Sequence, residues 1–327
     1  TNRLQYRDKI SNTVGQVVDA YLSLVQAKMN SDIQKQNLKQ EKNQFWVAKK
    51  KLQAGQIAPS DYRQQQATYL RDRLQYTKQT QSLDDQYQAL IKVLGLSPAS
   101  RLQTPRVLRM SRLQVSVPSR SVAVETALRN NVSYQTTLIG LRGLQREVIK
   151  ARDALKWELD ATYTHNFNAQ STTYVKTASG QLVPIKTQAP GENTGSLSLD
   201  IPINNLSAKK DLVTARINYE MGKLKLRQAK RDLVQKVVDD YRKLTSDKLQ
   251  LRMDVQSVHL QKKVLQDALL KYTYGKTSSF EVSSIRQNTL TQQQSYVSDQ
   301  MQYFQDLNKV HQDMGDYLGV WHIKLRY

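Results

Sequence analysis

The residue types that most often carry catalysis or bind metals are sparse in this chain. Its four histidines, His165, His259, His311 and His322, lie far apart and form no HExxH or other ligand spacing. The chain has no cysteine, which excludes a thiol nucleophile, a disulfide framework and a cysteine-based zinc site. We therefore expect no metal, no other cofactor and no enzyme activity.

Two pairs of adjacent aspartates, Asp84-Asp85 and Asp239-Asp240, are the remaining candidates for acid–base chemistry. Neighbouring residues on an α-helix point about 100° apart, so the two members of such a pair cannot act together on one substrate atom. Solvated helix faces explain both pairs. The carboxylates therefore add no support for an enzyme.

Charge points to a different class of partner. Lys and Arg number 49 against 28 Asp and Glu, a formal net charge of +21, which favours nucleic acid or an anionic membrane. The basic runs are short, however, and no RNP-like or zinc-finger pattern accompanies them. No apolar run reaches the roughly 18 residues of a transmembrane helix, although a transmembrane strand needs no such run.

The sequence repeats itself when 220 is added to a residue number. VVDAY at 17–21 returns as VVDDY at 237–241, and Gly55 returns as Gly275. Asp61 meets Glu281 in the same register. We interpret each copy as a helical hairpin with a glycine at its bend.

The register changes near the end of each copy. VLGL at 93–96 matches YLGV at 317–320 at an offset of 224, which predicts four extra residues in the second copy. An insertion of that size is about one helical turn, so the same helix face keeps pointing the same way.

Long helices are predicted by apolar residues that recur at spacings of three and four. Such stripes cover the segments 1–55, 60–94, 207–271 and 279–317. The segment 207–271 carries two stripes, which indicates two helix neighbours. At 1.5 Å per residue its 65 residues would span roughly 100 Å.

The predicted domain organisation is two repeats joined by a connector. The first repeat covers 1–95, the extended connector 96–121 and the second repeat 122–327. Within the second repeat we expect helices at 122–157, strands at about 158–170 and 194–203, and a long helical hairpin at 207–318.

The two strands are predicted by a change of period from 3.6 to two. Apolar side chains alternate with Asp, Thr, Asn and Ser in both segments. The polar segment between them reads as a long loop. Strands of this kind suit a transmembrane β-barrel, and a half-buried soluble hairpin fits the period equally well. The long helices favour the barrel, and the expected lipid-facing residues are then Leu159, Tyr163, Phe167, Leu197, Leu199 and Ile201.

Three segments resemble the TolC family of outer-membrane efflux proteins. SLSLDIPINNLSAKKDLVTA at 196–215 is similar to the family's strand-proline-helix junction, with Pro202 ending the strand. KLQAGQIAPSDY at 51–62 and KYTYGKTSSFEV at 271–282 are similar to its two periplasmic tip hairpins, in which an acidic residue follows the glycine by six positions.

The resemblance implies a mainly α fold with a small β part. It implies a homotrimer whose strands close one shared barrel in the outer membrane of a Gram-negative bacterium, continuing into an α-helical tunnel across the periplasm. In that family the tunnel is a passive exit duct for drugs or secreted proteins. An inner-membrane pump of ABC, RND or MFS type drives export through a periplasmic adaptor protein that docks on the tips, here Gly55 and Gly275.

The resemblance also implies a gate at the tips. The family links a tyrosine, an arginine and acidic residues there; Tyr272 and Asp61 match, and Glu281 replaces an aspartate. Thr277 stands at the arginine position with Lys276 beside it. We expect Tyr272, Asp61, Glu281 and Lys276 to form the gate, with a solvated helix end as the alternative. Ser284 replaces an aspartate of the family's cation-binding ring, which argues against that ring here.

The sequence departs from the family in its number of strands. Each family subunit brings four strands, two from each repeat, whereas this sequence shows two. We expect that about 100 residues of the first repeat, including its strand pair, precede residue 1 in the intact protein. The leading interpretation is a channel-tunnel subunit in contact with outer-membrane lipid and without a nucleic-acid partner. The alternative is a soluble, basic helical-hairpin scaffold that binds nucleic acid or anionic membrane.

Overall fold

The computed structural model describes residues 2–100, 118–166, 170–188, 192–201, 203 and 205–324. The chain divides into two compact units. One unit contains residues 1–136 and 228–327, and the other contains residues 137–227. Two helices, α4 (Val132–Asp153) and α5 (Leu206–Thr273), contribute residues to both units.

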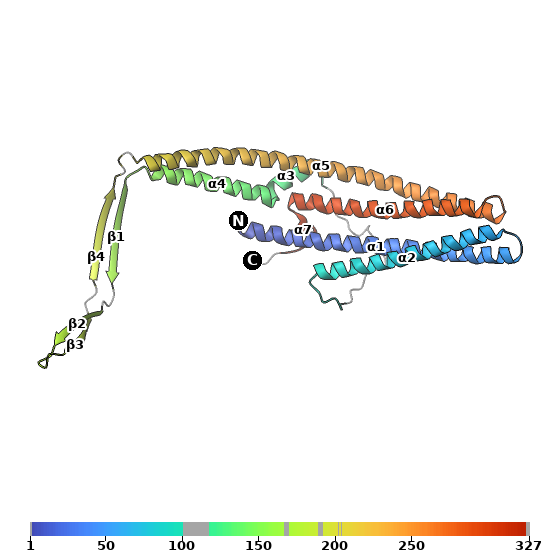
Figure 1. Cartoon of the computed structure of the whole chain (residues 1–327). Helices are drawn as coiled ribbons and strands as arrows, with labels where there is room; N and C mark the ends of the chain where they lie inside the picture. The colour runs from blue at the N-terminus through green and yellow to red at the C-terminus, as the bar shows by residue number, and fades with distance from the viewer. Residues whose placement is uncertain are drawn as a thin grey trace. The chain divides into compact units, whose positions relative to one another are not determined.

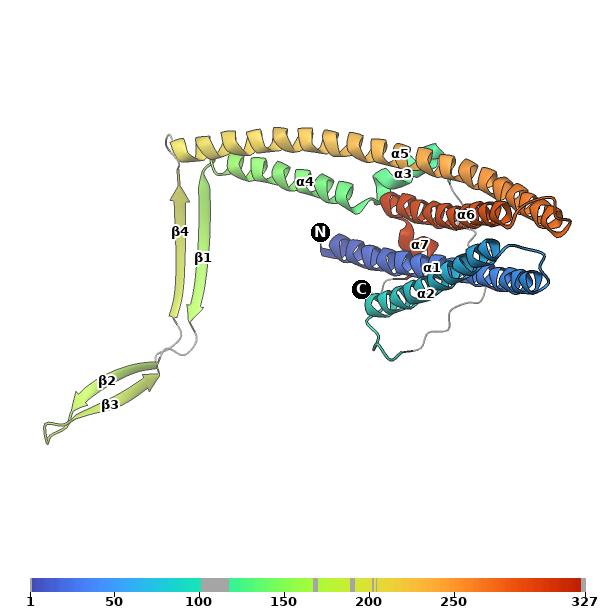
Figure 2. The same cartoon turned by 45° about the vertical axis from the view of Figure 1, so that its right-hand side comes forward.

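Two antiparallel helical hairpins make up most of the first unit. The first hairpin joins α1 (Asn2–Gln53) to α2 (Pro59–Val93), and the second joins the later part of α5 to α6 (Ser279–Met314). The two hairpins lie side by side with their bends at the same end (Figures 1 and 2). α5 is an uninterrupted helix of 68 residues, as the long apolar stripes predict.

The second helix of each hairpin shows that one sequence prediction is wrong. α2 begins at Pro59 and α6 begins at Ser279. A glycine of positive φ follows the end of each helix, Gly95 at 67° and Gly315 at 70°. These glycines keep the offset of 220, so the predicted four-residue insertion before the end of this helix is wrong. The match of VLGL to YLGV pairs Gly95 with a glycine in the short helix α7 (Tyr317–Val320), one turn beyond the true equivalent.

The main core of the first unit lies where the second hairpin meets α3 (Arg120–Asn130). It combines small residues of α3 with aliphatic residues of α5 and α6: Ala123, Ala127, Leu233, Val237, Leu244, Leu307, Val310 and Met314. Ala123 and Ala127 are fully buried. Small side chains on α3 allow its backbone to approach α6 closely, which positions the chain for the start of α4.

Asn131 separates α3 from α4 and fixes the turn between them. Its side-chain oxygen accepts a 3.0 Å hydrogen bond from the backbone N–H of Tyr134, which caps α4. Its amide nitrogen donates to the backbone oxygen of Asp313 at 3.0 Å and so ties the turn to α6. The connector predicted at 96–121 ends earlier than expected, because α3 begins at Arg120; its residues 101–117 lie outside the described residues.

The second unit holds two antiparallel strand pairs. β1 (Glu158–Asn166) pairs with β4 (Glu192–Asp200), and β2 (Gln170–Lys176) pairs with β3 (Leu182–Gln188). β1 and β4 are the strands that the alternating residues predict. Beyond β4, Asn205 caps α5 by accepting a 3.0 Å hydrogen bond from the backbone N–H of Ala208.

The polar segment between β1 and β4 is not the simple loop that the sequence predicts. β2 and β3 form a hairpin within it, closed by a turn at Gly180, whose φ is 83°. Pro184 lies inside β3 opposite Tyr174, and a proline is tolerated there because both strands of a two-stranded sheet are edges. The count of two strands is therefore wrong, although both pairs come from the segment between α4 and α5.

The predicted fold class, mainly α with long antiparallel hairpins and a small β part, is confirmed. The division into two repeats at 1–95 and 122–327 stays a prediction. Within the described ranges, every helix is too short or too polar to cross a membrane.

Candidate functional site

The bends of the two hairpins share one backbone motif. At the end of α1 the N–H of Gly55 donates to the oxygen of Leu52 at 3.0 Å, and the N–H of Gln56 donates to the oxygen of Lys51 at 2.8 Å. This crossed pair is the Schellman motif, in which the glycine must adopt a left-handed conformation. Gly55 has a φ of 66°, so a side chain at this position would strain the bend.

The second bend repeats the motif at the equivalent positions. The N–H of Gly275 donates to the oxygen of Tyr272 at 3.1 Å, and the N–H of Lys276 donates to the oxygen of Lys271 at 2.9 Å. Gly275 has a φ of 70°, and an added Cβ would meet nothing within 4 Å at either glycine. Both bends therefore present open backbone to solvent.

Three side chains from both hairpins meet beside these bends. The Nζ atom of Lys51 on α1 lies 4.6 Å from the ring centroid of Tyr272 on α5, a cation–π contact. Burial raises the pKa of the Tyr272 hydroxyl, and the negative charge of Asp61 on α2 raises it further. The structure thus brings together Tyr272 and Asp61, two of the predicted gate residues, and adds Lys51.

The other two predicted gate residues lie at the second bend: Glu281 in the first turn of α6, and Lys276 just before that helix. Ser278 caps α6 by accepting a 3.1 Å hydrogen bond from the backbone N–H of Glu281, and the Glu281 carboxylate accepts one from Thr277. Lys276 contributes its backbone N–H to the bend of α5. Asp61 and Glu281 both lie in the first turn of a helix, where a negative charge is favourable.

A buried ion pair joins the two hairpins at a point away from their bends. Arg286 on α6 contacts Glu41 on α1, and these side chains are 6% and 0% exposed. Gln65 on α2 donates a second hydrogen bond to Glu41. Burial raises the pKa of Glu41, while the Arg286 charge opposes that rise. The pair therefore connects three helices at one point.

Further buried polar groups extend this cluster along α1. Asn37 donates to the Asp72 carboxylate on α2 at 2.8 Å, and the Gln34 amide lies 3.5 Å from the Asp72 backbone oxygen. Burial raises the pKa of Asp72, and the hydrogen bond from Asn37 works in the opposite direction. The first hairpin is thus held by polar contacts where an ordinary core would be apolar.

Sequence reasoning missed this cluster because its members are far apart in the chain. Glu41 and Arg286 are separated by 245 residues. A signal was present in α1, where the buried residues Gln34, Asn37 and Glu41 follow one another at helical spacings. Adding 220 to their numbers gives Asp254, Ser257 and Gln261, so the second copy does not reproduce the cluster.

The strands place the predicted lipid-facing residues on one face. Leu159 lies opposite Leu199, and Ala161 lies opposite Leu197, so these residues share a face of the β1–β4 pair. Their exposed fractions in the single chain are high, 63% for Leu159, 74% for Leu197 and 71% for Tyr163. Ile201 follows β4 and is 44% exposed, whereas Phe167 and Pro202 lie outside the described residues.

The opposite face of the same strand pair is polar. Asp160 lies opposite Ser198, Thr162 opposite Ser196, and Glu158 opposite Asp200. Three of these side chains are acidic and lie at the end of the pair nearest the helices in sequence. Among the described residues, no group of three or more potential metal ligands is placed to hold an ion.

Comparisons with known proteins agree with this architecture. The family model described as outer membrane efflux protein matches residues 1–96 and 123–316. A search of curated proteins finds no match. Several solved structures share the fold, and three of them show how far the likeness extends.

CusC, from a study of transmembrane channel formation, is 17% identical with a TM-score of 0.79, over 96% of this chain and 70% of its own. The Campylobacter jejuni outer membrane channel CmeC is 19% identical with a TM-score of 0.71, over 96% and 64%. The open state of the Neisseria gonorrhoeae outer membrane channel MtrE is 14% identical with a TM-score of 0.75, over 96% and 68%. The chain thus spans about two thirds of the length of each channel.

Proposed function

The chain belongs to the outer membrane efflux protein family, and on that premise we propose that three copies of it form a passive exit duct. In this proposal the β1–β4 strands join those of the other copies in a barrel in the outer membrane of a Gram-negative bacterium. The helical hairpins line a tunnel through the periplasm. The duct itself performs no chemistry and carries drugs or secreted proteins outward.

The observation that carries the proposal is the division of the β1–β4 pair into two faces. Leu159, Leu197 and Leu199 share one face and are more than half exposed in the single chain. Apolar side chains on a two-stranded pair need a cover, because such a pair has no core of its own. Lipid outside and water inside a closed barrel supply both environments that the two faces require.

An assembly experiment tests this assignment. Leu197→Asp places a charge on the proposed lipid face, and Ser196→Asp places the same charge on the neighbouring polar face. We expect Leu197→Asp to block membrane assembly and Ser196→Asp to leave it intact. Heat-resistant trimers extracted from the outer membrane provide the measurement. Equal tolerance of both substitutions would refute the barrel assignment.

We further propose that the two bends are the docking points of a periplasmic adaptor, which links the duct to an inner-membrane pump of ABC, RND or MFS type. The matched Schellman motifs support this proposal, since both bends offer backbone without a covering side chain. The absence of cysteine from the sequence allows a direct test. Gln56→Cys at the first bend should form cross-links to the adaptor, and Lys78→Cys on the middle of α2 should not.

The gate is proposed to consist of Tyr272 and Asp61 together with Lys51, with Glu281 and Lys276 shaping the second bend. The Lys51 contact with the Tyr272 ring ties α1 to α5 beside the bends. Widening of the tunnel at this end requires the second hairpin to move away from the first, which would separate Lys51 from Tyr272. The contact therefore favours the closed arrangement.

A further inference from the structure

Six aspartates face one another along the second hairpin. On α5 they stand at 240, 247 and 254, and on α6 they stand at 299, 306 and 313. A spacing of seven residues is about two helical turns, so the three on each helix share one face. Because α5 and α6 run antiparallel, this spacing places Asp240 with Asp313, Asp247 with Asp306, and Asp254 with Asp299.

The two carboxyl groups of each pair lie near enough for one to raise the pKa of the other. Asp240 acts in this way on Asp313, Asp306 on Asp247, and Asp299 on Asp254. The three aspartates Asp254, Asp306 and Asp313 are only 4 to 9% exposed. A carboxylate oxygen accepts hydrogen bonds and cannot donate them, so a carboxyl–carboxyl bond requires a proton on one member.

Unpartnered oxygens mark where those protons belong. Four buried carboxylate oxygens have no hydrogen-bond partner among the described residues, and they are the Oδ2 atoms of Asp240, Asp247, Asp254 and Asp313. Each of the three pairs contains at least one of them. Two charged carboxylates in contact repel each other strongly, and one shared proton removes that repulsion.

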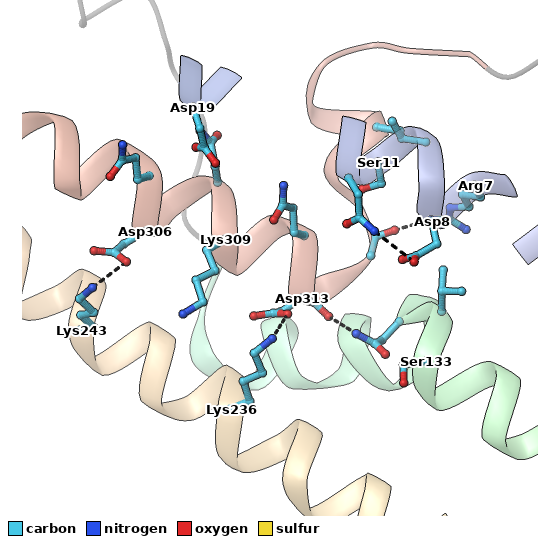
Figure 3. A pocket seen from close by; sticks show the side chains of 18 of the residues that line it. Arg7, Asp8, Ser11, Asp19, Ser133, Lys236, Lys243, Asp306, Lys309 and Asp313 are labelled. Carbon is cyan, nitrogen blue, oxygen red and sulfur yellow. Dashed lines mark hydrogen bonds and ion pairs between the residues drawn. The ribbon is translucent and has the colours of Figure 1, made fainter. Parts of the chain in front are cut away.

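Lysines lie beside the pairs, and those on α5, Lys236 and Lys243, are also seven residues apart. Lys236 contacts Asp313 at 2.5 Å, Lys243 contacts Asp306 at 2.9 Å, and Lys309 of α6 contacts Asp240 at 3.4 Å. Figure 3 shows Lys236 and Lys243 reaching from α5 toward the α6 aspartates. At the third pair Gln250 takes the lysine position and donates to Asp254 at 3.0 Å, while Ser295 contacts Asp299 at 3.4 Å.

Other helices complete the surroundings of the first two pairs. Asp306 and Asp313 line a polar cavity of about 730 Å³, to which α1 brings Arg7, Asp8 and Asp19 (Figure 3). The turn between α3 and α4 brings Asn131, and the start of α4 brings Ser133; neither side chain carries a charge. A cavity of this size admits water, so protons on these pairs exchange with solvent.

Burial gives one member of each pair an unusually high proton affinity. Burial and the neighbouring Asp240 carboxyl group raise the pKa of Asp313 to about 6, against the lowering effect of Lys236. Burial and the neighbouring Asp306 carboxyl group raise the pKa of Asp247. Burial, followed by the charge of Asp299, raises the pKa of Asp254. For Asp306 burial acts upward, but hydrogen bonds from Gln302, Lys243 and Asp247 lower its pKa overall.

We propose that these three carboxyl pairs form a pH-dependent contact between α5 and α6, which we call the fastening. The fastening is closed when each pair holds one proton, and it loosens when those protons leave to solvent. The second hairpin carries Tyr272 and Gly275, so a looser hairpin changes the bend that they form. The fastening stands on the paired aspartates alone, whereas its effect on transport rests on the proposed duct.

The direction of the pH effect follows from the raised pKa of Asp313. The folded pKa of about 6 exceeds the ordinary value of 3.8, so the stabilisation is complete below the ordinary value and is lost as pH rises through about 6. That shift changes the folding equilibrium on the order of 100-fold between acid and neutral solution for this one group. Asp247 and Asp254 act in the same direction.

Asparagine substitutions test the fastening in the full-length protein purified in detergent. Asp247→Asn, Asp254→Asn and Asp313→Asn combined replace each raised carboxyl by an amide that donates without a proton from solvent. Asp267→Asn, on an exposed part of α5, is the matched control. We expect the wild type and the control to melt at lower temperature at about pH 8 than at about pH 5. The triple variant should lose a clear part of that difference, and the raised pKa values of Glu41 and Asp72 should preserve the rest.

The single variant Asp313→Asn keeps the test decisive if the triple variant fails to fold, since it should lose part of the same difference. Infrared spectra of the wild type near pH 5 and pH 8 provide an independent readout: the band of protonated carboxyl groups should fall as pH rises, and Asp313→Asn should reduce that change. A melting difference that is equal in all variants, or an infrared band that Asp313→Asn leaves unchanged, would overturn the proposal. If the wild-type protein shows the expected pH dependence of melting but no channel activity, the proposed duct is refuted and the fastening is not.

Discussion

Replacing Arg286 should destabilise the protein far more than replacing an exposed arginine. Arg286→Met leaves the Glu41 carboxylate fully buried with Gln65 as its remaining side-chain donor. Removal of one partner from a buried pair costs about 3 to 5 kcal/mol, which corresponds to a fall of about 5 to 8 °C in Tm for a chain of this length. Arg129→Met is the control, because the Arg129–Glu125 pair is 75% and 62% exposed and should cost less than about 1 kcal/mol.

Thermal unfolding of the purified full-length protein, followed by circular dichroism, measures both effects. Burial already raises the pKa of Glu41 above its ordinary 4.5, and loss of Arg286 removes the main opposing charge. The variant's deficit should therefore be small where Glu41 is protonated and grow as pH rises through its raised pKa. Adding Glu41→Gln to Arg286→Met should recover most of the loss. Equal Tm shifts for Arg286→Met and Arg129→Met, or no recovery in the double variant, would refute the reasoning.

Two further substitutions probe the helix ends and the bends. Gly315→Ala should destabilise the protein by clearly more than Gly95→Ala in a denaturant titration: both lose a left-handed glycine at about 1 to 2 kcal/mol, but a Cβ at Gly315 would also lie 2.4 Å from the backbone oxygen of Asn130. Equal midpoints for the two variants would contradict that packing. Tyr272→Ala should raise the fraction of open time in single-channel recordings by a factor of about 2 to 5 for each copy that takes part in opening, because the lost Lys51 contact is worth about 0.5 to 1 kcal/mol per copy. Tyr274→Ala, at a ring that is 70% exposed, should leave the open time unchanged, and a matching rise there would remove Tyr272 from the gate.

The sequence predicted the features that rest on local patterning. The repeated glycines Gly55 and Gly275 marked both bends, because a Schellman motif needs a residue of positive φ at that point. The alternation around Leu159 and Leu197 marked β1 and β4, since period two is a property of the strand itself.

The strand pair β2–β3 escaped prediction because its pattern is mixed. Leu182, Val183, Pro184 and Ile185 follow one another without alternation, and a proline ordinarily argues against a strand. Both strands of this hairpin are edge strands. A strand there needs neither regular alternation of apolar residues nor the exclusion of proline.

The polar contacts escaped prediction because they join residues far apart in sequence. The apolar residues Leu38 and Phe45 of α1 are partly exposed, whereas the polar residues Gln34 and Glu41 are fully buried. Polar residues on a buried helix face require partners from another helix. Their burial was therefore invisible until α1, α2 and α6 were brought together.

Single-channel conductance of the full-length protein, purified in detergent and added to a planar lipid bilayer, tests the proposed duct most directly. We expect discrete, long-lived conductance steps in the presence of the wild-type protein, and none when the segment from β1 to β4 is deleted. A bilayer that stays silent, with a protein that remains dispersed after detergent is removed, would contradict the duct. That result would favour a basic helical scaffold, whose affinity for nucleic acid or anionic lipid should fall steeply with salt.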